Sequence, residues 1–168
     1  MKGMRLQLDL EKNYQKKTTL MILGGIFMAA SLLFLLTLFW WNQRIIPVDV
    51  GGCETDNGQL TYKITKTYGT NFIKLEGYAY VPGQSIDYAD ISVIAYHPAE
   101  DKYYRLPTEI VKKTKITKKA GDGHNYDYCG FSSVVLADKI WDDTKFYIRC
   151  QHNGMDILVD TGEVFDYK

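Results

Sequence analysis

Apolar residues are concentrated in one uninterrupted block near the start of the chain. The block runs from residue 18 to residue 41 and contains 24 residues without a charged side chain. As an α-helix with a rise of about 1.5 Å per residue it is roughly 36 Å long, enough to cross a hydrocarbon core about 30 Å thick. Trp40 and Trp41 stand at its end, where indole rings prefer the headgroup layer. The block therefore predicts a single transmembrane helix.

Basic residues flank this block unequally. Residues 1–17 contain five of them, Lys2, Arg5, Lys12, Lys16 and Lys17, whereas residues 42–59 contain only Arg44. Because the more basic flank stays in the cytoplasm, we predict a cytoplasmic N-terminus and an extracytoplasmic C-terminal part. The block is longer than the apolar region of a cleaved signal peptide, and no small-residue cleavage site follows it directly. We therefore interpret it as an uncleaved signal-anchor.

After the block, the pattern changes to an alternation of apolar and polar residues. Four stretches show it, with apolar positions at Leu60, Tyr62 and Ile64, at Ile73, Leu75 and Ala79, at Ile91, Val93 and Ala95, and at Phe146, Ile148 and Cys150. This period is typical of half-buried antiparallel strands. Asn153-Gly154 predicts a type I′ hairpin between residues 146–151 and 156–160, and only residues 134–141 indicate a short helical turn.

About seven short strands separated by turn residues predict an all-β fold. The expected architecture is an immunoglobulin-like antiparallel β-sandwich preceded by the single transmembrane helix. We divide the chain into a cytoplasmic tail (1–17), the transmembrane helix (18–41), a linker (42–58) and an extracytoplasmic β-sandwich domain (59–168). The linker assignment rests on its glycines and proline and on the lack of an apolar period.

The predicted membrane helix carries small residues on one side. Gly25 and Ala29 are four residues apart, a spacing that allows a second helix to approach closely. One interpretation is a helix-packing surface through which the chain joins a larger membrane complex, such as a transporter, polymerase or secretion system. The other is that glycine and alanine are simply frequent in membrane helices.

Charge and composition narrow the function classes. The chain of 168 residues has 20 basic and 20 acidic residues, so its formal net charge is zero, which argues against nucleic acid as a partner. A hydrophobic share of 46% with 24% charged residues is typical of a folded protein rather than a disordered one.

The three cysteines, Cys53, Cys129 and Cys150, all lie on the predicted outer side, where disulfides can form. One possibility is a buried bridge between Cys129 and Cys150, which fall in two predicted strands. Cys53 could pair with either of them instead, or all three thiols could be free. No CxxC or HxxxH spacing indicates zinc.

Catalytic motifs are missing from the sequence. It has no G-x-S-x-G element and no glycine-rich phosphate loop. Asp122, His124 and Asp127 lie within six residues, but their spacing does not fit a calcium loop, and we interpret them as a polar loop. His97 and His152 stand beside turns and are expected to face solvent. We therefore predict a protein that is not an enzyme and has no metal or cofactor.

Two surface features remain as binding candidates. Residues 112–119, KKTKITKK, contain five cations: Lys112, Lys113, Lys115, Lys118 and Lys119. They either protect a sheet edge from unwanted pairing or contact an anionic polymer or lipid headgroups. The chain also has 13 tyrosines, among them Tyr78 and Tyr80, which favour strands and bind sugars or proteins if several are exposed and coplanar.

Four short motifs follow one another in the second half of the chain: GYAYVPG at 77–83, YYRLPT at 103–108, CGF at 129–131 and FYI at 146–148. Over residues 73–167 the series resembles β-sandwich accessory modules of Gram-positive proteins that build or export cell-surface polysaccharide and teichoic acid. Such modules carry an Arg-x-Asp-Val stretch after Pro-Thr, where this chain has KKTKI. The resemblance implies a noncatalytic accessory protein of envelope polysaccharide assembly on a bacterial cytoplasmic membrane, with an anionic glycopolymer as its partner.

Overall fold

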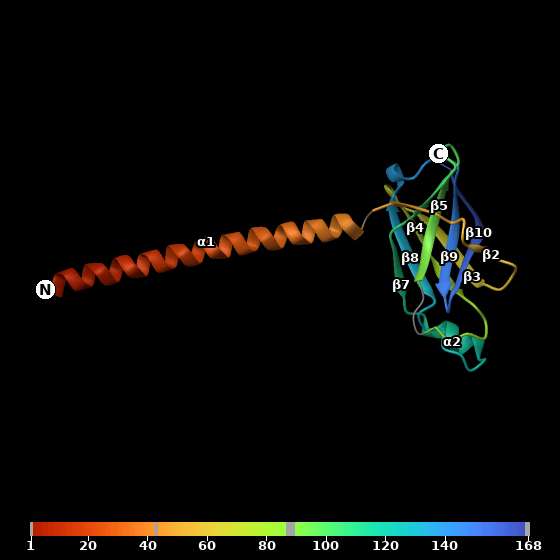
Figure 1. The fold of residues 1–168 in the computed structure, drawn as a ribbon, viewed down its shortest axis with the longest axis horizontal. Coiled ribbons are helices and arrows are strands. Elements are labelled where there is room, and N and C mark those ends of the chain that lie inside the picture. The colour runs from red at the N-terminus through yellow and green to blue at the C-terminus, as the bar shows by residue number, and fades with distance from the viewer. Residues whose placement is uncertain (1, 43, 87–89, 167–168) are drawn as a thin grey trace. The chain divides into compact units, whose positions relative to one another are not determined.

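The computed structural model describes residues 2–42, 44–86 and 90–166, and within the N-terminal helix it describes the side chains of residues 14–41 (Figure 1). The chain divides into two compact units, one ending at Asn42 and the other beginning at Gln43. The first unit is a helix and the second is built from strands.

Helix α1 spans Lys2–Asn42 and therefore begins well before the predicted membrane segment. Its portion Tyr14–Trp41 is 28 residues long and contains an 18-residue window with a mean hydropathy of 2.4, so it is long and apolar enough to cross a membrane. The hydroxyls of Thr18, Thr19 and Thr37 donate to backbone carbonyls four residues earlier, at 2.8–3.0 Å. These polar groups are thus satisfied within the helix, as an apolar surrounding requires.

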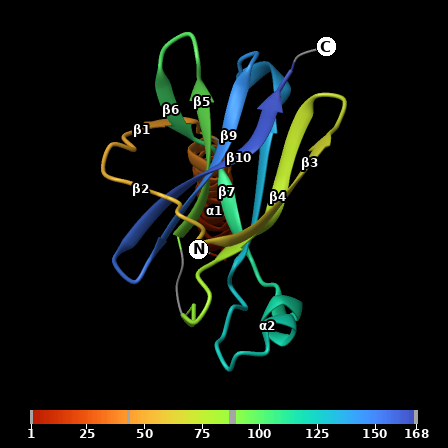
Figure 2. The same cartoon turned by 90° about the vertical axis from the view of Figure 1, so that its right-hand side faces the viewer.

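The second unit contains two sheets (Figures 1 and 2). The larger has six strands in the order β1 (Ile46–Val48), β6 (Lys102–Arg105), β5 (Asp90–His97), β9 (Thr144–His152), β10 (Met155–Phe165) and β2 (Glu54–Thr55). The smaller has four, β3 (Thr61–Tyr68), β4 (Phe72–Tyr80), β8 (Gly130–Leu136) and β7 (Thr108–Val111). All neighbours are antiparallel except β10 and β2, which are parallel. Two short helices complete the unit, α2 (Thr114–Ala120) and the 3₁₀ turn η1 (Ala137–Lys139).

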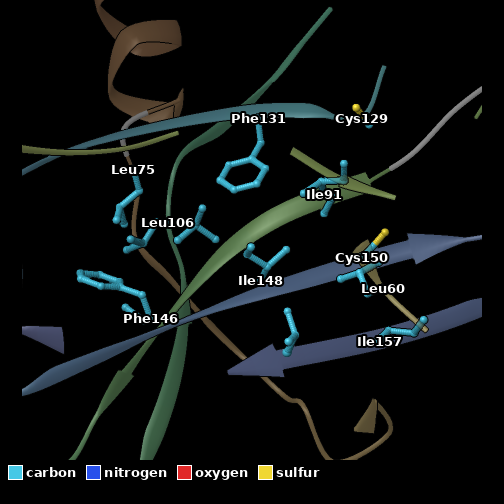
Figure 3. Packing of buried hydrophobic residues seen from close by; sticks show 14 of the residues in the cluster. Leu60, Leu75, Ile91, Leu106, Cys129, Phe131, Phe146, Ile148, Cys150 and Ile157 are labelled. Atoms are coloured by element: carbon cyan, nitrogen blue, oxygen red, sulfur yellow. The ribbon is translucent and has the colours of Figure 1, made fainter. Parts of the chain in front are cut away.

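Both sheets contribute to one hydrophobic core (Figure 3). The four-stranded sheet supplies Leu75 and Phe131, and the six-stranded sheet supplies Phe146, Ile148 and Ile157, all less than 3% exposed. In β4 the exposure alternates along the whole strand, with the buried residues facing this core. The alternation predicted from the sequence therefore places β3, β4, β5 and β9 as observed.

The predicted hairpin at Asn153-Gly154 is confirmed. It joins β9 to β10, and both residues have positive φ, 49° and 80°, as a type I′ turn requires. The short helical turn expected within residues 134–141 is η1. The structure supports a mostly β fold of two sheets with one apolar N-terminal helix.

Residues 42–58 were predicted as a linker, but Asn42 ends α1 and residues 44–58 form part of the β unit. Its β1 pairs with β6 at one edge of the six-stranded sheet, and its β2 pairs with β10 at the other edge. Ile45 packs against the core, and the Asp56 carboxylate accepts from three successive backbone amides, of residues 58–60. Strands of three and two residues are too short to show a period, so the sequence pattern could not reveal them.

Candidate functional site

A groove of about 590 Å³ opens on the four-stranded sheet. Six of the residues that line it define what we call the lysine groove: Lys63, Glu76, Tyr78, Lys112, Lys113 and Lys115. They come from β3, β4 and the segment that follows β7, so residues far apart in the sequence meet in one place. Three of the five lysines predicted as a binding run lie here, together with one of the two predicted tyrosines.

The strand alternation places the floor of the groove on the outer face of the sheet. In β4, Ala79 is buried in the core, so its neighbour Tyr78 and, two residues earlier, Glu76 face outward. Lys63 of β3 is directly opposite Tyr78 and shares its face. Because the strand order is β3, β4, β8, β7, Lys63 stands on the side of Tyr78 away from the lysines that follow β7.

A glycine makes room for Lys113 on the other side of Tyr78. Gly130 of β8 is directly opposite Tyr78. A Cβ at this position would lie 2.7 Å from Lys113 Cγ and 2.3 Å from the Val111 carbonyl oxygen. Since glycine has no such atom, the aliphatic part of Lys113 lies over Gly130 and brings its charged end toward the groove.

Lys112 and Lys113 follow β7, the edge strand of the four-stranded sheet, and the rest of the lysine run folds as helix α2, so the run does not form the edge strand that one interpretation expected (Figure 2). Ile116 and Ala120, four residues apart, pack against the core from one face of the helix. Gly121 ends it in the left-handed conformation, with φ of 64°, and its amide donates to the Thr117 carbonyl. The strand preference of threonine and isoleucine is thus outweighed by tertiary packing.

The side chains of one loop fix α2 to the sheet. The Thr117 hydroxyl donates to Asp127 Oδ1 at 2.7 Å and accepts from the Tyr126 amide at 2.9 Å. The Lys113 amide donates to the Asp127 carbonyl oxygen at 2.7 Å. This network holds the segment that carries Lys112, Lys113 and Lys115 in place beside β8.

The lysine groove is strongly basic. Among the described residues, Lys63, Lys113 and Lys115 form no salt bridge, whereas Lys112 pairs with Asp127 at 3.5 Å. Glu76, the one acidic residue lining the groove, is bound by Lys74 of the same strand. That hydrogen bond and charge, with a smaller contribution from Lys113, lower the pKa of the Glu76 carboxyl. Three lysine charges therefore remain without a protein partner.

The other predicted site residues lie outside the groove. Lys118 and Lys119 are exposed in the last turn of α2, where their charge complements the helix dipole. Tyr80 packs its ring at 4.3 Å from that of the buried Tyr126. Sequence reasoning missed Lys63 and Gly130, because only the register between strands brings them to Tyr78.

Three tyrosines of the six-stranded sheet, Tyr96, Tyr103 and Tyr147, are not coplanar. Tyr103 packs against Tyr96 at 4.9 Å with a 43° tilt, and against Tyr147 at 5.7 Å with a 72° tilt. Burial, followed by the charge of Asp160, raises the pKa of Tyr147 to about 12. These rings are packed mainly on one another, which accounts for them without a ligand.

The polar loop Asp122, His124 and Asp127 is engaged in separate contacts. Asp122 Oδ2 accepts from the buried Tyr126 hydroxyl at 2.5 Å, and this bond lowers the pKa of the Asp122 carboxyl. Asp127 accepts a hydrogen bond from the Thr117 hydroxyl of α2, and His124 lies 3.4 Å from the Ser85 hydroxyl. Within the part of the chain that the structure describes, no three histidine, cysteine or acidic side chains are grouped so that they could hold a metal ion.

Two histidines predicted to face solvent are enclosed instead. His152 ends β9 and is 6% exposed. His97 ends β5 and stacks on the Trp141 ring at 4.3 Å. A position beside a turn does not decide burial when a neighbouring segment folds over it.

The three cysteines are free thiols, which is one of the three alternatives that the sequence left open, and neither the Cys129–Cys150 bridge nor a Cys53 pairing is present. Both are buried in the core (Figure 3). Burial raises the pKa of Cys129 to about 11 and that of Cys150 to about 12. They act as small apolar core residues.

On α1, a Cβ at Gly25 would meet no atom within 4 Å. The helix-packing role of Gly25 and Ala29 stays a prediction.

Comparison of the chain with protein-family models, curated proteins and solved structures finds no match. The resemblance to polysaccharide-assembly modules likewise stays a prediction, and the function is argued from the lysine groove.

Proposed function

We propose that this chain is a membrane-anchored, noncatalytic binding protein whose β unit lies outside a bacterial cytoplasmic membrane. The β unit binds an anionic glycopolymer of the envelope, and the protein acts as an accessory protein of polysaccharide assembly. The observation that carries the proposal is the lysine groove, which Tyr78 lines together with three lysines that form no salt bridge within the described part of the chain. A cluster of unpaired cations attracts an anion by Coulomb forces, and the attraction is strengthened where walls limit the access of water.

The arrangement of these lysines favours a polymer over lipid headgroups. Lys63 stands on one side of Tyr78, and Lys113 and Lys115 belong to the other side. A chain lying in the groove is contacted by cations from both sides.

The membrane part of the proposal rests on α1. Its portion Tyr14–Trp41 is apolar and long enough to span a bilayer, and the basic excess before it favours a cytoplasmic N-terminus. The two sheets and their common core support an immunoglobulin-like sandwich as the architecture of the β unit. Protease added to intact spheroplasts should digest the β unit, and its survival while known external proteins are cut would exclude this orientation.

Two double variants test the binding site at equal net charge. K113Q/K115Q removes two groove lysines, and K118Q/K119Q removes two lysines of the same run outside the groove. With each groove lysine contributing about 1 kcal/mol, the first variant should bind about thirtyfold more weakly and the second should bind like the unaltered chain. The measurement is the fluorescence anisotropy of labelled hyaluronan and of labelled polyphosphate, each titrated with the full chain in neutral detergent.

Three outcomes would contradict the proposal. Equal losses in the two variants mean that the attraction is nonspecific. Binding of neither polymer means that the groove takes no polyanion. Binding to vesicles of phosphatidylglycerol, with no binding to either polymer, assigns the lysines to the membrane surface.

A further inference from the structure

We infer that the lysine groove binds a sugar ring together with the anionic group attached to it, so that its ligand class is an acidic or phosphate-substituted glycan rather than any polyanion. In this arrangement Tyr78 contacts the ring, and Lys63 and Lys113 hold the anion from two sides. The inference rests on the proposed function and adds to it the chemistry of the repeating unit and a binding role for Lys63.

The strand register sets the positions of these three residues. Lys63, Tyr78 and Gly130 are directly opposite one another on three adjacent strands. Since neighbouring strands are about 4.8 Å apart, Lys63 and Gly130 lie about 10 Å apart, with Tyr78 midway. The aliphatic part of Lys113 covers Gly130. Tyr78 thus stands between Lys63 on one neighbouring strand and the aliphatic part of Lys113 over the other.

Tyr78 is half-buried and packs partly against the core, and it also lines the groove, so part of its ring can contact a ligand. Its neighbour along the strand, Tyr80, lies 6.2 Å away and tilted by 31°, and it does not line the groove. Among the described residues no other aromatic ring is stacked on Tyr78. A phenol ring beside a polar group suits the mixed apolar and hydroxylated surface of a sugar. The groove volume of about 590 Å³ lies in the ~300–1,000 Å³ range of small-ligand sites.

Glu76 disfavours a ligand that is charged along its whole length. It faces the groove two residues from Tyr78, on the same side of β4, and the bond from Lys74 keeps it ionised. Because Lys74 already pairs with Glu76, this carboxylate leaves no cation there for an anionic group, whereas a sugar hydroxyl can donate a hydrogen bond to it. The groove therefore favours a neutral hydroxylated unit beside an anionic one.

Binding of two labelled polymers to the full chain in neutral detergent distinguishes ring recognition by Tyr78 from charge recognition by the lysines. Hyaluronan alternates carboxylate-bearing and neutral sugars, and polyphosphate has charges but no ring. Y78A should weaken hyaluronan binding two- to tenfold and leave polyphosphate binding unchanged. K63Q should weaken both about fivefold, and the control K118Q neither. E76Q should strengthen polyphosphate binding without strengthening hyaluronan binding.

Each result bears on one part of the inference. Equal losses for both polymers in Y78A, or no loss for either, would exclude ring recognition. Unchanged binding of K63Q would exclude the two-sided contact. Either result leaves the proposed function standing as long as K113Q/K115Q still weakens binding; if that variant binds normally, the proposed function itself fails. If Y78A does not fold, Y78L replaces it in the experiment, because leucine keeps most of the side-chain volume without an aromatic ring. Y78F keeps the ring and should retain hyaluronan binding.

Discussion

The salt dependence of polymer binding measures how many groove lysines take part. A protein cation that neutralises a charge on a polyanion releases a bound counterion, so the affinity falls as salt is added. For a flexible polyanion, each contact contributes about −0.7 to the slope of log affinity against log salt concentration. Lys63, Lys113 and Lys115 form no salt bridge with any residue that the structure describes, while Lys112 pairs with Asp127.

These contacts predict three slopes. The unaltered chain should give about −2, from three unpaired lysines at about −0.7 each. K113Q/K115Q leaves Lys63 alone and should give about −0.7. K118Q/K119Q, which carries the same net charge as the first variant, should keep a slope of about −2 because its substitutions lie outside the groove.

The assay is fluorescence anisotropy of labelled polyphosphate, titrated with the full chain at several sodium chloride concentrations. Thermal unfolding of both variants serves as the control for folding. If the two double variants lose the same amount of slope, the polymer senses overall charge rather than the lysine groove, and the reasoning is refuted.

Three further predictions concern the β unit. Burial raises the pKa of Cys129 to about 11 and that of Cys150 to about 12. Below about pH 9 both thiols are protonated in the folded and in the unfolded chain. As the pH rises from about 9 toward about 12 the thiols of the unfolded chain ionise first, so the free energy of unfolding should fall. Urea unfolding at several pH values should show this loss, and C150A should make it less steep. A chain starting at residue 59 lacks β1 and β2, so β6 and β10 become unpaired edges of the larger sheet. This chain should self-associate in analytical ultracentrifugation, whereas a chain starting at residue 44, which keeps both strands, should not. Gly77→Ala should lower the free energy of unfolding by about 1–3 kcal/mol in urea titrations, because its Cβ would lie 1.9 Å from the Lys63 carbonyl oxygen; an unchanged value would contradict the close packing of β3 on β4.

The sequence predicted those parts of the fold that have a long, simple pattern. The uninterrupted apolar block identified α1, and two-residue alternation identified β3, β4, β5 and β9. Asn153-Gly154 located a hairpin because few residues other than asparagine and glycine adopt positive φ at both turn positions. In each case a local physical rule determines the structure.

The errors have a common physical origin in contacts between distant segments. β1 and β2 exist because they pair with β6 and β10, and α2 exists because Ile116 and Ala120 meet the core. No local pattern marks either of them.

For the same reason, the sequence predicted only part of the candidate site. The lysine run and Tyr78 were predicted as binding residues, but Lys63 lies beside them only because of the register of β3 on β4. Gly130 matters through the space that it leaves for Lys113. A single sequence does not contain the strand register, so neither residue could be selected from it.

Lysine footprinting tests the central claim most directly. The full chain in neutral detergent is acetylated with and without an excess of hyaluronan, and the modification of each lysine is measured by mass spectrometry. The account predicts that the polymer protects Lys63, Lys113 and Lys115, while Lys118 and Lys119 on α2 react as before. Equal protection of all five, or protection of Lys118 and Lys119 alone, would contradict binding in the lysine groove.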